Sequence, residues 1–181
     1  MAHEDLNSKF KEAIVLENRK KIYELVRSSP GCHFREIERK IVLPHGTLRY
    51  NLNFLVKKEL LVEKKDGNNT RYFSKDFSSY NYELLGLLRQ KSIRKIILFI
   101  VSQKKCFHKD ITAFVNLSPS TISWHLNKLV EKGIVEKIWF KNHSSYKVKI
   151  NENEIIKLLI SYKDSFLDSL VNKTIEMWDL R

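Results

Sequence analysis

The chain has 181 residues, of which 33 are Lys or Arg and 21 are Asp or Glu, giving a formal net charge of +12. This excess of positive charge favours a polyanionic partner. The longest apolar stretch, residues 96–101, is far too short to span a bilayer, and the polar N-terminus is unlike a signal peptide, so we expect a cytoplasmic protein without membrane contact. Two cysteines provide no disulfide framework, which fits a reducing compartment.

The first predicted element is an amphipathic N-terminal helix within residues 1–17, with Leu6, Phe10, Ala13 and Ile14 on one face. A first small domain is expected over residues 18–74. Its pattern predicts three helices and a hairpin, at residues 19–27, 35–41, 45–58 and 61–73, with a break at Ser29-Pro30-Gly31.

The third of these helices has a buried stripe and a weak start. The stripe comprises Leu48, Leu52, Leu55 and Val56. The sequence Leu43-Pro44-His45-Gly46 supplies no Ser cap, and glycine is a poor helix former. We therefore expect this helix to start late or to become ordered on a ligand.

The hairpin that follows has a basic tip at residues 64–71. Asp66-Gly67 supplies the turn chemistry. Lys64, Lys65 and Arg71 are expected to place positive charge around the turn. There the hairpin, acting as a wing, would meet a phosphate or the minor groove of a nucleic acid.

A linker and a helix are expected over residues 75–92, and a second small domain over residues 93–151. Ser118 is the predicted cap of its third helix and Pro119 the first helical residue, while Gly133 ends that helix. The other predicted elements are helices at 94–102 and 109–115, a turn and short strand at 104–107, and hairpin strands at 134–140 and 146–150.

The two domains are an internal repeat with a constant offset of 74 residues and no gap. Over residues 32–72 the identical pairs number 11 of 41, which is too many for chance alignment, and they include Cys32/Cys106, Asn53/Asn127 and Tyr72/Tyr146. In the second copy the buried stripe comprises Ile122, Leu126, Leu129 and Val130.

The remaining residues, 152–181, are predicted to form one long amphipathic helix that extends to about residue 178. So wide an apolar stripe has to be covered. The helix either folds back on the second domain or pairs with a second copy of the chain. We favour a homodimer through Leu159, Tyr162, Phe166 and Leu170.

The stretch LSPSTISWHLNKLVEKGIVEK resembles the helix-turn-helix of the ArsR/MarR-like winged-helix repressors, and the likeness extends to both copies. The tandem arrangement is similar to archaeal regulators with two winged helices. The resemblance implies a mainly α fold with small β-hairpin wings, of the α+β class. It also implies sequence-specific binding of double-stranded DNA and control of transcription.

The third helix of each domain is its recognition helix. Independently of the resemblance, the residue types on the outward faces of these two helices and on the wings favour contact with DNA. Arg49 suits a bidentate contact to guanine and Asn53 suits adenine. In the first domain the candidates are His45, Thr47, Arg49, Tyr50, Asn53, Lys57, Lys64, Lys65, Asn68 and Arg71. In the second they are Ser118, Ser120, Thr121, Ser123, Trp124, His125, Lys128, Lys141, Asn142 and His143. Residues 81–150 carry a net charge of +9, against +5 for residues 1–80 and −2 for the tail.

Some of these assignments have structural alternatives. Tyr50 and Trp124 share one repeat position and either pack on the base of the wing or contact DNA. Asn53 and Asn127 either read bases or brace the wing. His125 is either structural or a phosphate contact.

Other chemistries find little support in the sequence. Cys32-His33 and Cys106-Phe107-His108 lack metal-ligand spacing, so each cysteine is expected to fill a small buried pocket. There is no phosphate-cradling glycine loop, HExxH motif or nucleophile elbow, so we expect no enzyme and no cofactor, and the sequence identifies no small-molecule effector. One rival function is that of a replication initiator or architectural DNA-binding protein. The other is a winged-helix scaffold for protein interactions, and such a scaffold would not need so basic a chain.

Overall fold

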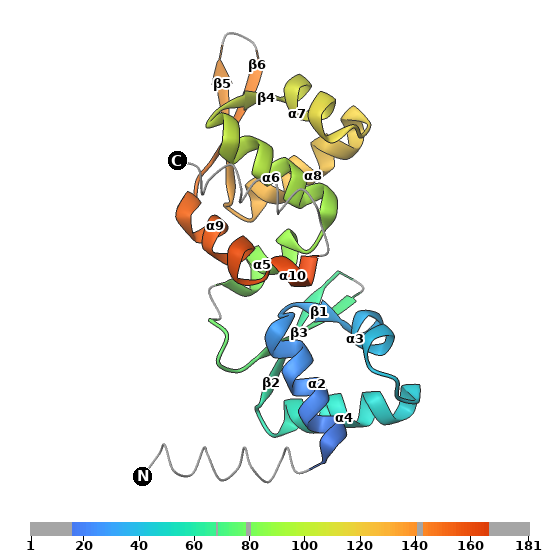
Figure 1. Ribbon diagram of the computed structural model, residues 1–181. Helices are drawn as coiled ribbons and strands as arrows, with labels where there is room; N and C mark the ends of the chain where they lie inside the picture. The colour runs from blue at the N-terminus through green and yellow to red at the C-terminus, as the bar shows by residue number, and fades with distance from the viewer. Residues whose placement is uncertain (1–15, 68, 79–80, 141–142, 167–181) are drawn as a thin grey trace. The chain divides into compact units, whose positions relative to one another are not determined.

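The computed structural model describes residues 16–67, 69–78, 81–140 and 143–166 (Figure 1). The chain divides into two compact units, Met1–Gly86 and Leu87–Arg181, each of which is described by itself. Residues 1–15 of the expected N-terminal helix lie outside the described residues, as do Asn68, Lys141, Asn142 and Leu170. Among the described helices, none has the length and apolar character that a bilayer crossing requires.

The first unit has the predicted order of helices followed by a hairpin. Its elements are α2 (Glu17–Ser28), β1 (Cys32–His33), α3 (Phe34–Lys40), α4 (His45–Lys57), β2 (Leu61–Asp66), β3 (Asn69–Ser74) and the start of α5 (Tyr82–Leu88). The predicted helices and hairpin are confirmed to within a few residues. The expectation of a late start for the recognition helix is wrong, because α4 begins at His45 although no side chain caps it.

The core of the first unit joins one face of each helix. Ile22 and Val26 of α2, Ile37 of α3 and Leu52 of α4 are fully buried together. The predicted stripe on α4 is confirmed for Leu48, Leu52 and Leu55, whereas Val56 is only half-buried.

A three-stranded antiparallel sheet closes this unit in the order β1-β3-β2. The two residues of β1 pair with the base of β3, with Cys32 opposite Tyr72 and His33 opposite Arg71. Asp66 pairs with Asn69 across the hairpin turn, where Gly67 has a φ of +58°. The turn therefore needs a residue that tolerates positive φ, as the Asp-Gly pair predicted.

The second unit repeats this architecture. Its elements are the end of α5, α6 (Lys91–Gln103), β4 (Cys106–Phe107), α7 (His108–Val115), α8 (Pro119–Glu131), β5 (Val135–Phe140), β6 (His143–Val148), α9 (Glu152–Ser161) and α10 (Lys163–Phe166). Its sheet has the matching order β4-β6-β5, and Cys106 pairs with Tyr146 as Cys32 does with Tyr72. The recognition helices and all six strands keep the offset of 74 residues, so the structure supports the register of the repeat.

The turn before α8 has the chemistry that the sequence predicted. Asn116 ends α7 in the left-handed conformation, with a φ of +58°. The Ser118 side chain accepts a hydrogen bond from the backbone N–H of Thr121, and Pro119 is the first helical residue. Because proline needs no hydrogen-bond partner there, α8 has a firmer start than α4.

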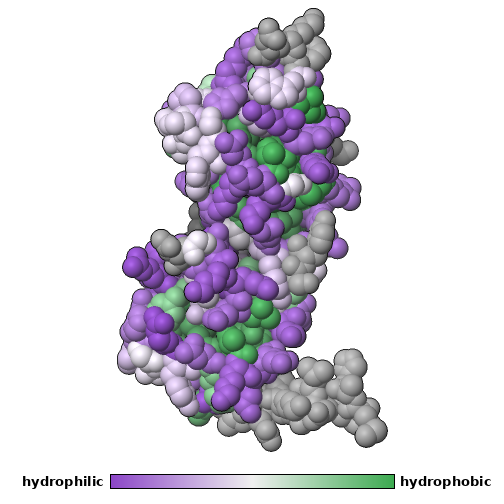
Figure 2. All heavy atoms as spheres, turned by 180° about the vertical axis from the view of Figure 1, so that it is seen from behind, coloured by the Kyte–Doolittle hydropathy of each residue, from purple (hydrophilic) through white to green (hydrophobic). Residues whose placement is uncertain are grey.

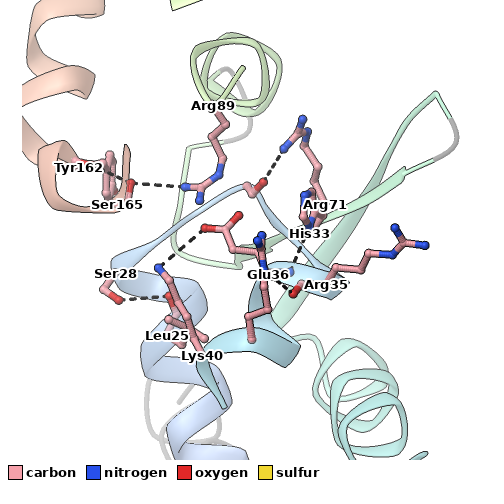
Figure 3. Close-up of polar contacts among 12 residues, drawn as sticks. Leu25, Ser28, His33, Arg35, Glu36, Lys40, Arg71, Arg89, Tyr162 and Ser165 are labelled. Atoms are coloured by element: carbon pink, nitrogen blue, oxygen red, sulfur yellow. Dashed lines mark hydrogen bonds and ion pairs between the residues drawn. The ribbon is translucent and has the colours of Figure 1, made fainter. Parts of the chain in front are cut away.

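The tail differs from the single long helix that was predicted, because α9 ends at Ser161 and a separate turn, α10, follows. Leu159 and Phe166 are buried within the second unit, and the Arg94 guanidinium lies 4.9 Å from the centre of the Phe166 ring. Arg89 donates to Ser165 Oγ, which donates to the half-buried Tyr162 carbonyl (Figure 3). The assignment of Leu159 and Phe166 to a dimer interface is therefore wrong: up to residue 166 the tail folds back on its own domain.

Candidate nucleic-acid interface

The outward face of α4 is polar and exposed. His45, Thr47, Arg49 and Asn53 are exposed, and 62% of the Tyr50 surface is accessible. Thus Tyr50 does not pack beneath the first wing. The opposite face of α4 is the buried stripe, so the core fixes which side chains the helix presents.

A buried polar contact, which the sequence analysis did not identify, fixes α4 against α2. Asn51 is buried between the hydrophobic positions of α4, and its amide donates to the Thr47 carbonyl at 2.8 Å. Arg19 Nε of α2 donates to Asn51 Oδ1 at 3.2 Å, and its guanidinium lies 3.5 Å from the centre of the Phe54 ring. These contacts hold the recognition helix in one orientation.

Arg49 is held by neighbouring side chains rather than extended freely into solvent. Its Nη2 lies 3.4 Å from His45 Nε2, and His45 Nδ1 lies 2.8 Å from Glu38 Oε1 of α3. The Phe34 ring lies 4.8 Å from the His45 ring and 5.0 Å from the Arg49 guanidinium. Helix α3 is itself fixed at its start, where His33 Nδ1 accepts from the Glu36 N–H (Figure 3).

The first wing presents Lys64 and Lys65 to solvent, and Lys57 is exposed at the end of α4. Arg71 differs from expectation. It is buried, its Nε donates to Asp66 Oδ2 at 2.8 Å, and its Nη1 donates to the Gly31 carbonyl at 2.9 Å. Because its donors are engaged beneath the wing, Arg71 braces the sheet, and its assignment to the DNA-contacting set is corrected.

The start of α8 gathers small hydroxyl side chains. Ser118 and Ser120 are exposed and Thr121 is half-buried. Ser118 Oγ lies 3.0 Å from Ser120 Oγ and 2.8 Å from Thr121 Oγ1. Hydroxyl groups at the N-terminus of a helix can contact phosphate or base edges at close range, since the helix start carries partial positive charge.

Ser123 and Trp124 lie one turn further along α8. Ser123 is half-buried, and its Oγ lies 2.9 Å from His108 Nε2 of α7. Trp124 is 60% exposed, so, like Tyr50, it does not pack beneath its wing. Lys128, which is half-buried, places its ammonium group 5.7 Å from the centre of the Trp124 ring.

His125 faces the interior, so its assignment to the contacting set is also corrected. It is buried at the repeat position of Asn51, with its ring 5.0 Å from that of Trp124. Burial lowers the pKa of His125, and the nearby Lys128 lowers this pKa further. The ring is therefore mainly neutral at neutral pH.

The second wing carries an exposed aromatic residue that the sequence analysis did not single out. Trp139 of β5 is 71% exposed, and Lys137 places its ammonium group 4.7 Å from the centre of the Trp139 ring. His143, a predicted contact, is exposed at the start of β6. Hydrophilic side chains predominate over the face drawn in Figure 2.

Both cysteines are buried and form no disulfide, one in β1 and one in β4, as predicted for pocket-filling residues. Burial raises the pKa of Cys106 to about 12, so its thiol stays protonated. Within the part of the chain that the structure describes, no three His, Cys, Asp or Glu side chains form a group that could hold a metal ion.

Comparison with known proteins gives a separate match for each unit. A family model of the HVO_0163 type, described as an N-terminal HTH domain, matches residues 16–85. The model of the bacterial regulatory protein arsR family matches residues 91–137. The chain contains two helix-turn-helix domains. The first HTH domain presents α4 as its recognition helix and the second presents α8, each followed by a hairpin wing.

The curated relatives are larger than this chain. The HTH-type transcriptional regulator MJ1398 of Methanocaldococcus jannaschii is 33% identical over 127 residues, which cover 69% of this chain and 32% of the relative. Protein MJ0772 of the same organism is 34% identical over 84 residues, or 46% of this chain and 24% of the relative. The chain thus spans about a third or less of these relatives.

Among solved structures, the AntR antimony-specific transcriptional repressor matches with a TM-score of 0.42 and 15% identity. The match covers 59% of this chain and 89% of that protein.

Proposed function

We propose that the chain is a sequence-specific double-stranded DNA-binding transcription regulator that reads DNA with α4 and α8 and contacts the backbone with its wings. Its action on DNA would place it in the cytoplasm. The proposed homodimer remains a prediction, and the burial of Leu159 and Phe166 removes two of the four residues first expected at its interface.

The observation that carries this proposal is the division of each recognition helix into a buried and a polar face. On α4, three leucines are buried while Arg49 and Asn53 are exposed. On α8, Ile122 and two leucines are buried while Ser120 is exposed. A helix-turn-helix protein reads the major groove with the exposed residues near the start of this helix.

Charge supports a nucleic acid over a protein partner. The net charge is +12, and residues 81–150, which include most of the second HTH domain, carry +9. Lys64 and Lys65 of the first wing are exposed, which supports a contact of this wing with phosphate. The relative MJ1398 is named an HTH-type transcriptional regulator, which agrees with this proposal.

Selection of bound duplexes from a random pool tests the proposal. We expect the full chain to enrich one short sequence motif, and Arg49→Ala to relax base preference at one position of it at a cost of about 1 to 3 kcal/mol in binding. Glu24→Gln is a control, because Glu24 is an exposed residue of α2 outside the candidate set. A pool without enrichment, or repeated arrays of sites typical of replication origins, would contradict regulation by this route.

A further inference from the structure

A histidine connects the second helix to the recognition helix in both HTH domains, although it comes from a different helix in each. In the first domain His45 of α4 lies between Glu38 of α3 and Arg49 of α4. In the second domain His108 of α7 lies between Thr112 of α7 and Ser123 of α8. Arg49 and Ser123 occupy the same repeat position, as do Glu38 and Thr112.

The proton positions on His45 follow from its partners. The Glu38 carboxylate only accepts hydrogen bonds, so at 2.8 Å from it His45 Nδ1 carries the proton and donates. In the neutral ring Nε2 then accepts from the Arg49 guanidinium at 3.4 Å. The Phe34 ring, 5.0 Å from that guanidinium, limits its movement further. Arg49 keeps its other N–H donors for an external acceptor.

The proton positions on His108 also follow from its partners. The Thr112 hydroxyl donates its single proton to the His108 carbonyl at 2.8 Å, so the hydroxyl can only accept from His108 Nδ1, 3.3 Å away. In the neutral ring Nε2 is therefore the acceptor, and the Ser123 hydroxyl donates to it at 2.9 Å. Ser123 has then used its one donor, and only its oxygen lone pairs remain for an external partner.

We propose that His45 and His108 are positioning residues: His45 fixes the place of the Arg49 guanidinium, which can only donate, and His108 fixes the polarity of the Ser123 hydroxyl. His45 holds Arg49 as a donor toward the O6 and N7 acceptors of a guanine. His108 makes Ser123 an acceptor for the exocyclic amino group of an adenine or a cytosine in the major groove. The inference rests on the proposed function, because it concerns what the same two helices read.

Removal of one hydrogen-bonding group from a base tests this inference on the duplex that the wild-type chain enriches. A guanine replaced by 7-deazaguanine loses the N7 acceptor. An adenine replaced by purine, or a cytosine by pyrimidin-2-one, loses the amino donor. We expect wild type to lose about fivefold or more in affinity for each change at the contacted base, since a base contact contributes at least about 1 kcal/mol. Arg49→Ala and Ser123→Ala identify the two contacted bases.

The histidine variants give the decisive comparison. His45→Ala should abolish the penalty for 7-deazaguanine and leave the penalty for the missing amino group, whereas His108→Ala should do the reverse. His45→Gln and His108→Gln, which retain an acceptor, should restore most of each penalty. Glu24→Gln, matched in charge change to Glu38→Gln, should behave as wild type, whereas Glu38→Gln should weaken the guanine penalty.

The outcomes separate the two hypotheses. If wild type enriches no sequence, the proposed function fails and the inference fails with it. If wild type enriches a sequence but both alanine variants keep both penalties, or lower affinity equally for all duplexes, the positioning role alone is overturned. Thermal melting of each variant identifies misfolding, and the glutamine variants then provide the test.

Discussion

Arg71 is covered by neighbouring groups at the base of the first wing. It bonds Asp66 and the Gly31 carbonyl, and a Cβ at Gly86 would lie only 3.3 Å from its Cδ. We expect Arg71→Ala to lower the free energy of unfolding by about 2 to 3 kcal/mol, because buried partners lose charged hydrogen bonds. Urea unfolding measures this effect.

Lys65 on the same wing is the matched control. It is exposed, so Lys65→Ala should change stability by less than about 0.5 kcal/mol and reduce DNA affinity instead. Equal stability losses in the two variants would show that Arg71 is not a brace.

The burial of His125 predicts a loss of stability in acid. Its pKa is lowered in the folded state by burial and by Lys128, so the unfolded chain binds more protons. The stability that the neutral ring provides is present above the ordinary histidine pKa of about 6.5 and is lost as pH falls below it. We expect unfolding by urea to require less denaturant at about pH 5.5 than at about pH 7.5.

His125→Asn separates this effect from other titrating groups, since Asn51 occupies the same position in the first domain and does not titrate. The variant should lose less stability between the two pH values than wild type. An equal loss would assign the acid sensitivity to other residues.

At this scale the sequence predicts the buried face of each helix better than the fate of individual polar side chains. Periodicity identifies Leu48, Leu52 and Leu55, because hydrophobic side chains are buried with little regard to their exact neighbours. Asn51 and Arg71 are buried through partners far along the chain, Arg19 and Gly31, and no local pattern reveals such pairs.

Among the elements, α4 combines a weak start with an unstrained glycine. Gly46 lies in the first turn, and nothing lies within 4 Å of a Cβ added there. We expect Gly46→Ala to raise the free energy of unfolding by up to about 1 kcal/mol, because alanine has the higher helix propensity. Thermal melting of the two proteins provides the comparison.

Gly67 provides a control of opposite sign. A Cβ there also meets nothing within 4 Å, but the residue has a φ of +58°. Gly67→Ala should therefore destabilise the hairpin by about 1 kcal/mol through backbone strain alone. Destabilisation by both substitutions would contradict the account of α4.

The elements themselves were largely predictable, and the exceptions have physical causes. Ser118, Pro119 and Gly133 mark the ends of α8 by local chemistry that the sequence displays directly. The break after Ser161 could not be inferred from periodicity, because the apolar stripe continues through Phe166. The strand Cys32–His33 is too short to show an alternating hydrophobic pattern. A short strand at this place was therefore predicted only in the second copy.

For the whole molecule, the internal repeat combines one common fold with two different sets of exposed side chains. The first offers Arg49 and a basic wing, and the second offers hydroxyl groups on α8 and an exposed Trp139 on its wing. The repeat register made the common fold predictable from one chain. The two histidine networks depend on side-chain positions in space, which the register alone could not provide.

The central proposal, that the chain contacts duplex DNA through both HTH domains, is tested most directly by the salt dependence of affinity. Each phosphate contact contributes about −0.9 to the slope of log affinity against log salt. Lys64→Ala and Lys128→Ala, one in each domain, should each reduce the slope by about 1, and together by about 2. Lys157→Ala, in the tail, should leave it unchanged. If only one of the two lysines changes the slope, only one domain contacts the DNA, and the claim is contradicted.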